Sequence, residues 1–141
     1  MLTFEGPFSY ENPPVIKVTI RAPFMESAPQ KGVRAMLDTG SNVCVVSSTI
    51  LADPPLSWLG PVNLITSSGS KDTVSYGAAV ILRDGADTAV IEPAKVVYGE
   101  PVGHYELIIG RDVLNLGTLT VGYGKFSFQI NSGHHEPTHH P

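Results

Sequence analysis

The sequence lacks the features that define several large classes of protein. Cysteine occurs once, as Cys44, so the chain can form no disulfide within itself, which favours a reducing compartment. No apolar run approaches the roughly 20 residues of a membrane-spanning helix. The first residues, MLTFEGPFSYENPP, have neither the basic nor the apolar region of a signal peptide. We therefore expect a cytoplasmic protein that has no membrane partner.

Basic residues are too few and too scattered for a nucleic-acid-binding protein. Lys and Arg number 9 against 13 Asp and Glu, and the formal net charge is -4. A basic patch is the usual footprint of nucleic-acid binding, so no nucleic-acid partner is expected. Four histidines near the C-terminus occur as two adjacent pairs, a spacing that could bind nickel or zinc by chance. The segment has no periodicity, so it gives these side chains no fixed geometry. No metal and no other cofactor is predicted. These histidines are His134, His135, His139 and His140.

Glycine and proline are plentiful instead, with 14 and 12 residues, and short β-branched runs lie between them. This pattern is typical of an all-β domain. In residues 15–21, Ile16, Val18 and Ile20 alternate with polar residues, as in a strand with one buried face. One or two strands broken at Pro93 are expected within 88–98. Further strands are predicted at 33–37, 43–47, 62–66, 73–82, 105–109, 118–121 and 125–130.

The organisation along the chain predicts one domain with a terminal extension on each side. Residues 1–14 form an N-terminal arm, 15–130 form the domain, and 131–141 form a His-rich tail without periodicity that is expected to be disordered. One short helix is expected at about 110–116. The Pro-rich segment 51–61 is expected to be irregular.

A single acid, Asp38, lies between two apolar runs at 35–37 and 43–46. Burying a carboxylate costs several kcal/mol unless the protein holds it or uses it. The turn 38–41 has the sequence DTGS, whose small residues can form hydrogen bonds. One interpretation is an acid that stabilises a turn by accepting backbone N–H groups. The other is a catalytic carboxylate, and the tetrapeptide alone leaves both open.

Three segments, taken in order, resemble those of the retropepsin-like aspartic proteases. They are LDTGS at 37–41, a hairpin at 62–82 with a small polar tip, and IIGRDVL at 108–114. The resemblance covers about residues 15–130. It implies an all-β, closed or partly open acid-protease barrel with a flap hairpin and one short C-terminal helix. It also implies an aspartic endopeptidase that acts on a protein or peptide substrate.

The resemblance gives each residue of the DTGS turn a role. Asp38 would be the catalytic carboxylate, and the Thr39 hydroxyl would hold the loop through a hydrogen bond to the partner loop. Gly40 has no Cβ, so the backbone of the substrate could come close to it. The Ser41 hydroxyl would donate to the carboxylate and favour its charged form, which predicts activity that leans towards acidic pH.

The other two segments would support this site. Gly110 would let the apolar pair Ile108 and Ile109 pack under the active loop. Arg111 would form a structural ion pair near the subunit interface rather than touch the substrate. Asn42 and Val43 stand where retroviral members often carry acids, so Arg111 needs another partner. The flap tip would close over the substrate, although an ordinary exposed turn is the alternative; its residues are Thr66, Ser67, Ser68, Gly69 and Ser70.

One carboxylate is too few for this chemistry. Attack on an amide needs a base that takes a proton from water and an acid that protonates the carbonyl oxygen. Two close carboxylates that share one proton supply both. No other aspartate is followed by Thr-Gly or Ser-Gly, and the chain is about half the length of a two-lobed enzyme. The resemblance therefore implies a homodimer in which each chain contributes Asp38.

Two alternatives keep the fold but change the function. The first is a weakly active or inactive dimer that holds extended peptides as a binding or scaffold module; the departures at Asn42 and Val43 favour it. The second is a monomeric domain that becomes active only when fused to its neighbours in a polyprotein.

Overall fold

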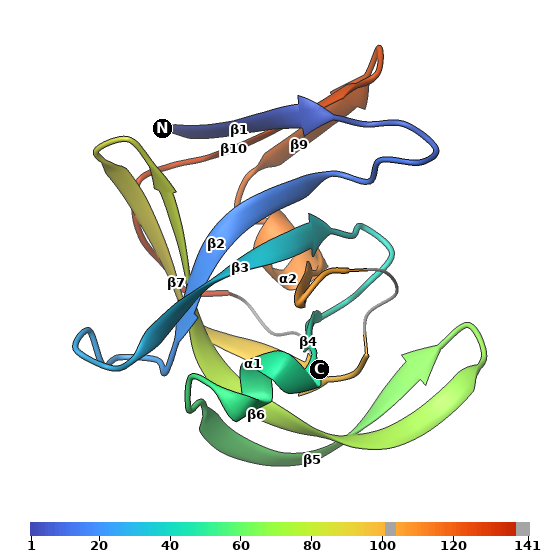
Figure 1. Cartoon of the computed structure of the whole chain (residues 1–141), viewed down its shortest axis with the longest axis vertical. Helices are drawn as coiled ribbons and strands as arrows, with labels where there is room; N and C mark the ends of the chain where they lie inside the picture. The colour runs from blue at the N-terminus through green and yellow to red at the C-terminus, as the bar shows by residue number, and fades with distance from the viewer. Residues whose placement is uncertain (101–103, 138–141) are drawn as a thin grey trace.

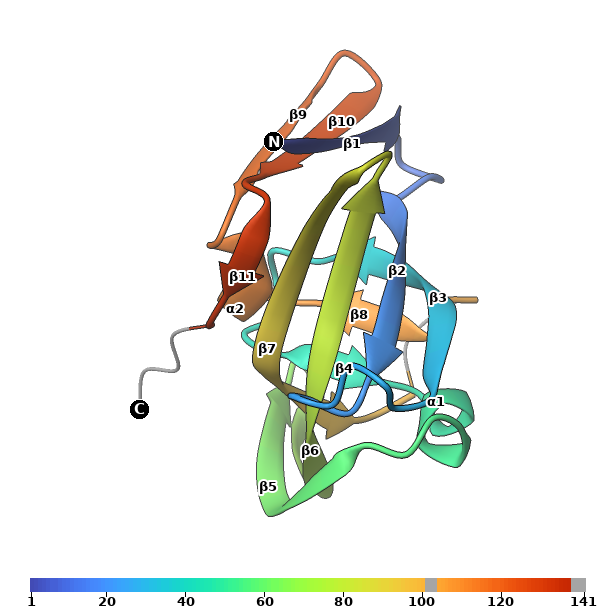
Figure 2. The ribbon, with the colours of Figure 1, turned by 90° about the vertical axis from the view of Figure 1, so that its left-hand side faces the viewer.

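Six strands close into a barrel that contains most of the buried side chains (Figures 1 and 2). Their order is β7-β4-β8-β3-β2-β6, and β6 also pairs with β7, which completes the ring. The structure is a computed structural model that describes residues 1–100 and 104–137. The strands are β2 (Val15–Arg21), β3 (Gln30–Leu37), β4 (Cys44–Val46), β6 (Gly69–Asp84), β7 (Asp87–Tyr98) and β8 (Leu107–Ile109).

The alternation in β2 shows why these sequences form barrel strands. Ile16, Val18 and Ile20 are buried, whereas Lys17 between them is exposed. A closed barrel buries the inward face of every strand, so apolar side chains recur at every second position. The predicted strands at 15–21 and 33–37 are confirmed, and β3 begins three residues earlier than expected.

A second, three-stranded antiparallel sheet lies at the top of Figure 1, with the order β1-β10-β9. β9 (Thr118–Gly122) and β10 (Lys125–Ile130) form the predicted hairpin. β1 (Leu2–Pro7) lies within the segment expected as an N-terminal arm, and it pairs with β10 along its whole length. The inward side chains of Leu2, Phe126 and Phe128 are buried, which ties both ends of the chain to one core.

The predicted break at Pro93 is wrong. β7 runs without interruption from Asp87 to Tyr98. Its register against β6 shifts between the pairs Ala78 with Ala94 and Val80 with Ile91, so Glu92 and Pro93 together lie opposite Ala79. Such a bulge accommodates a proline because the residue needs no ladder N–H there.

Both helices are short. α2 (Arg111–Leu114) lies where the sequence predicts a helix at about 110–116, although it is shorter. α1 (Ser48–Ala52) and the start of β5 (Ser57–Thr66) fall partly in the segment 51–61, which was expected to be irregular and is therefore more ordered than predicted. In the part of the chain that the structure describes, no helix has the length and apolarity needed to cross a bilayer.

The expectation of a disordered tail is wrong for its first part. β11 (Gly133–His135) pairs in parallel with β7, at the left of Figure 2. The Nε2 atom of His134 lies 3.3 Å from the Oε1 atom of Glu92. This contact and the strand pairing give the segment a fixed position. His139 and His140 lie outside the described residues.

Glu92 connects three parts of the barrel through one buried carboxylate. Its Oε2 atom accepts hydrogen bonds from the Nη1 atom of Arg21 at 3.2 Å and from the backbone N–H of Phe24 at 2.8 Å. The exposed fractions of Arg21 and Glu92 are only 4% and 7%. Burial by itself would raise the pKa of Glu92, but the Phe24 N–H, Arg21 and His134 outweigh it and lower this pKa below 4.5.

Replacing Glu92 with Gln should lower the free energy of unfolding by about 3 kcal/mol at about pH 7, because it leaves Arg21 buried without its counter-charge. A carboxyl group with a lowered folded-state pKa stabilises the protein above its unfolded-state pKa and loses this effect as the pH falls through the folded-state value. The difference in free energy of unfolding between wild type and variant should therefore be smaller at about pH 3 than at about pH 7. Urea denaturation at the two pH values measures it, with Glu5→Gln, an exposed acid of β1, as the control. A difference that stays the same at both pH values would contradict this role.

Candidate active site

Asp38 begins the loop that joins β3 to β4. Its backbone N–H donates to the carbonyl oxygen of Ile109 at 2.9 Å. β3 and β8 run in parallel, with Leu37 beside Ile109, so the loop starts where β8 ends. Two strand ends therefore fix the backbone of Asp38, and its side chain is half-buried.

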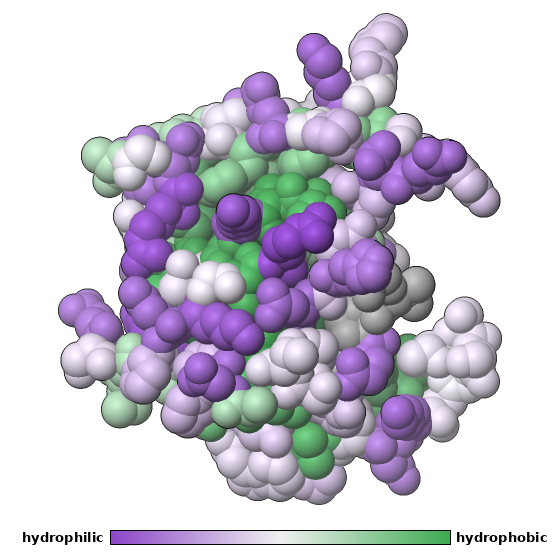
Figure 3. Space-filling model, in the orientation of Figure 1, coloured by the Kyte–Doolittle hydropathy of each residue, from purple (hydrophilic) through white to green (hydrophobic). Residues whose placement is uncertain are grey.

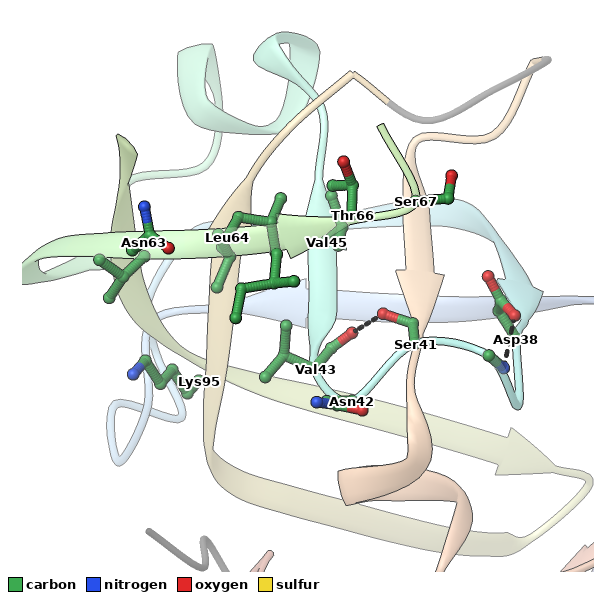
Figure 4. Close-up of a pocket in the computed structure, with 14 residues that line it drawn as sticks. Asp38, Ser41, Asn42, Val43, Val45, Asn63, Leu64, Thr66, Ser67 and Lys95 are labelled. Atoms are coloured by element: carbon green, nitrogen blue, oxygen red, sulfur yellow. Dashed lines mark hydrogen bonds between the residues drawn. The ribbon is translucent and has the colours of Figure 1, made fainter. Parts of the chain in front are cut away.

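The DTGS turn orients the carboxylate (Figure 4). The Oδ1 atom of Asp38 accepts a hydrogen bond from the Gly40 N–H at 2.8 Å, and the carbonyl oxygen of Asp38 accepts one from the Ser41 N–H at 3.2 Å. A Cβ on Gly40 would lie 3.1 Å from Oδ1, closer than an ordinary contact. Within the described chain, the second carboxylate oxygen, Oδ2, accepts no hydrogen bond. One oxygen of Asp38 thus holds the turn, and the other remains available.

The predicted contact between Ser41 and Asp38 is wrong. The Ser41 hydroxyl donates to the carbonyl oxygen of Val43 at 2.7 Å instead (Figure 4). The backbone carbonyl two residues ahead lies within reach of this short side chain, and the hydroxyl stabilises the loop rather than the carboxylate. The expected acidic lean of the activity therefore loses the contact on which it rested. The side chain of Thr39 is exposed in the single chain.

Arg111 holds the same loop from the first turn of α2. Its guanidinium group donates to the carbonyl oxygen of Thr39 at 3.1 Å and to the side-chain oxygen of Asn42. Its backbone N–H donates to the carbonyl oxygen of Ser41 at 2.8 Å. Arg111 forms no ion pair among the residues described, so the expected acidic partner does not occur among them. The amide of Asn42 takes that place, and Arg111 supports the loop through neutral acceptors.

Gly110 is required by packing. A Cβ at this position would lie 2.4 Å from the carbonyl oxygen of Val43 and 2.8 Å from that of Ser41. No real side chain tolerates such distances from a backbone. Ile109, which precedes it, is 1% exposed and packs in the barrel core. The structure thus places Ile109, Gly110 and Arg111 directly against the Asp38 loop.

The nearby cysteine is a packing residue. Cys44 is fully buried, and its Sγ atom lies 3.6 Å from the Oδ1 atom of Asp112. Burial, followed by the adjacent charge of Asp112, raises the pKa of the Cys44 thiol well above 9.0. A thiol that stays protonated is a poor nucleophile. Asp112 also accepts the backbone N–H of Val113 at 2.9 Å, in the first turn of α2.

A long hairpin of β5 and β6 forms the flap. Its strands pair from Ser57 with Gly77 as far as Thr66 with Gly69, so the paired hairpin begins five residues earlier than the predicted 62–82. The tip projects at the lower right of Figures 1 and 3 as a mainly polar lobe. The Thr66 hydroxyl donates to the carbonyl oxygen of Gly69 at 3.0 Å, and the φ of Gly69 is 123°, in the region that favours glycine.

A cleft of about 620 Å³ lies between the flap and the Asp38 loop (Figure 4). Of the predicted flap-tip residues, Thr66 and Ser67 line it, whereas Ser68, Gly69 and Ser70 do not. Its walls carry both apolar and polar side chains and come from the loop, the flap and β7. The lining residues are Asp38, Gly40, Ser41, Asn42, Val43, Val45, Val62, Asn63, Leu64, Ile65, Thr66, Ser67, Lys95 and Val97.

Several wall residues were not predicted from the sequence. Val62 and Leu64 alternate in β5 and are half-buried, which the period of two in this segment could have indicated. Lys95 and Val97 come from β7, about 30 residues further along the chain. No local pattern connects them with Asp38, because barrel closure brings β7 beside β4.

The closed six-stranded barrel, the hairpin over the Asp38 loop and the short helix after β8 define the retropepsin-like fold. By sequence, no protein-family model matches the chain, and no curated protein matches it. By structure, the chain is similar to a retropepsin-like aspartic protease from Rickettsia conorii, with a TM-score of 0.59 and 10% identity over 93% of each chain. It is also similar to EIAV protease in complex with the inhibitor HBY-793, with a TM-score of 0.54 and 16% identity over 77% of this chain and 90% of that one.

Proposed function

We propose that this chain is an aspartic endopeptidase that works as a homodimer, with Asp38 of each chain facing the other across a twofold axis. The observation that carries the proposal is the position of Asp38. Its carboxylate is held by a backbone N–H on one side only, and it lies at the edge of a cleft large enough for peptide side chains. The retropepsin-like fold of the chain supports this assignment.

The two carboxylates would share the acid and base roles. One, as its anion, takes a proton from a water molecule while the water oxygen attacks the carbonyl carbon of the substrate. The other, protonated, gives its proton to the carbonyl oxygen, which produces a neutral tetrahedral diol. As the diol collapses, the C–N bond breaks, the amine nitrogen receives the proton of the protonated carboxyl group, and the ionised carboxylate takes the proton of one diol hydroxyl, so that the pair again shares one proton. No covalent intermediate with the enzyme forms.

The flap and the cleft would bind an extended substrate. Val43 and Val45 from the loop side and Val62 and Leu64 from the flap form apolar walls for alternate side chains of the substrate. Closure of the flap tip through Thr66 and Ser67 would shield the reacting bond from bulk water. The free thiol of Cys44 suits a reducing compartment, and we propose a cytoplasmic location.

A second candidate function is a peptide-binding module with the same fold. One observation favours it: a single chain already forms the whole cleft of about 620 Å³, so an extended peptide could be held without a second Asp38. Such a module would bind peptides and leave them intact.

A mixing experiment tests the shared site. Wild-type chain is equilibrated with a ninefold excess of the Asp38→Asn variant, and cleavage of an excess of denatured protein substrate is measured. If only dimers with two copies of Asp38 are active, random pairing should reduce the activity per wild-type chain to about a tenth. An equal mass of an unrelated protein serves as the control. Unchanged activity in the mixture would show that each chain acts alone, and cleavage by neither preparation would favour the binding module.

A further inference from the structure

We propose that Lys95 makes the cleft selective for peptides with an acidic side chain at the end remote from Asp38. The inference rests on the proposed function, because it names the class of substrate for the same cleft. It comes from the charges of the cleft wall. Of the lining residues, only Asp38 and Lys95 have an acidic or basic side chain.

Lys95 lies on the cleft side of β7. It shares the lining with Val97, two residues further along the strand, as the period of two in a strand requires. Its side chain is half-buried. In Figure 4, Lys95 and Asp38 lie at opposite ends of the cleft, and Val43, Asn42 and Ser41 lie between them. The ammonium group is therefore remote from the reacting end of the cleft.

The ammonium group of Lys95 has no counter-ion within the described part of the chain. The four ion pairs found there join other groups, and no hydrogen bond of Lys95 occurs among those residues. Lys71 and Lys31, by comparison, each lie near an acid: Lys31 pairs with Glu106 at 3.4 Å, and Lys71 acts on Glu100. An unpaired cation beside apolar walls, where water screens less than in bulk, attracts a carboxylate.

The position of this charge also limits where the acid can lie. A carboxylate bound close to Asp38 would meet a like charge, whereas one at the Lys95 end would meet its opposite. In a homodimer, the twofold axis places one Lys95 at each end of the combined groove. The favoured substrate is therefore an extended apolar segment that carries Glu or Asp on both sides of the cleaved bond, away from the bond itself.

The test uses peptides with an apolar centre and a single Glu placed in turn at each flanking position, each matched with its Gln counterpart. Cleavage is measured with the wild-type chain. Binding is measured by fluorescence polarisation with the Asp38→Asn variant, so that the charge preference is read independently of catalysis. The same pairs are then compared after adding Lys95→Met, which removes the charge, and Lys95→Glu, which reverses it. Lys17→Met removes an exposed lysine of β2 that does not line the cleft, and it is the matched control.

We expect the Glu peptide to be preferred about fivefold at the outer positions, a preference that Lys95→Met removes and Lys17→Met keeps. Lys95→Glu should instead favour Gln over Glu at these positions. Equal binding of Glu and Gln peptides by the Asp38→Asn variant, or a preference that survives the addition of Lys95→Met, would overturn the inference. Binding that depends on Lys95 without any cleavage would support the inference and refute the proposed protease activity.

Discussion

Replacing Asp38 with Asn is expected to abolish peptide cleavage and to leave the folded chain intact. In a homodimer the substitution removes both carboxylates, and with them the base and the acid of the reaction, so the rate should fall by at least about 10³-fold. The amide oxygen of Asn can still accept the Gly40 N–H that now binds Oδ1 at 2.8 Å. We therefore expect the free energy of unfolding to change by no more than about 0.5 kcal/mol.

Cleavage of a denatured protein, followed over a range of pH, measures the activity, and urea denaturation measures the stability. Asp53→Asn is the matched control, because Asp53 is exposed at the end of α1 and does not line the cleft. Cleavage by the Asp38→Asn variant at the wild-type rate would remove Asp38 from the mechanism. A loss of stability together with activity would instead favour the interpretation of Asp38 as a turn-stabilising acid.

Replacing Gly110 with Ala is expected to destabilise the protein strongly, because it adds a methyl group directly against the Asp38 loop. The added carbon would lie 2.4 Å from the carbonyl oxygen of Val43, so β8 and the Asp38 loop must move apart. Overpacking of this kind costs about 3 kcal/mol. The φ of Gly110 is -93°, which alanine adopts readily, so the effect is one of contact and not of backbone strain.

Urea denaturation measures the stability of the Gly110→Ala variant, and binding of a pepstatin-type transition-state mimic reports the geometry of the loop. Gly32→Ala is the control, because a Cβ at Gly32 has no atom within 4 Å and should leave stability unchanged or raise it by up to about 1 kcal/mol. If Gly110→Ala is as stable as Gly32→Ala, the contact between Gly110 and Val43 does not determine the position of the loop.

The sequence predicts the central strands well because they carry a strong local signal. β2 and β10 alternate apolar and polar residues, and each has one face in the core. β11 has no such signal, and in β1 the alternation covers only residues 2–5. Each is a strand because of the partner it meets, β10 for β1 and β7 for β11, and these partners are far away in the sequence. α1 has only five residues, too few for a helical period to appear.

In the candidate site too, some features could be predicted from the sequence and others could not. The motifs DTGS and IIGRD could be found because each is contiguous, and the structure brings them together through the pairing of β3 with β8. The acceptor of the Ser41 hydroxyl could not be predicted, since the Val43 carbonyl and the Asp38 carboxylate are both near in sequence. Lys95 could not be predicted either, because its place in the cleft depends on the closure of the barrel.

The pairing of β1 with β10 has a consequence for how a dimer would assemble. Because β1 and β10 of one chain pair with each other along all six residues of β1, the two strands are hydrogen-bonded to each other without a second subunit. Two subunits of this kind would associate as folded monomers, without exchanging terminal strands. Association would then be readily reversible, and the active fraction of the protein would depend on its concentration.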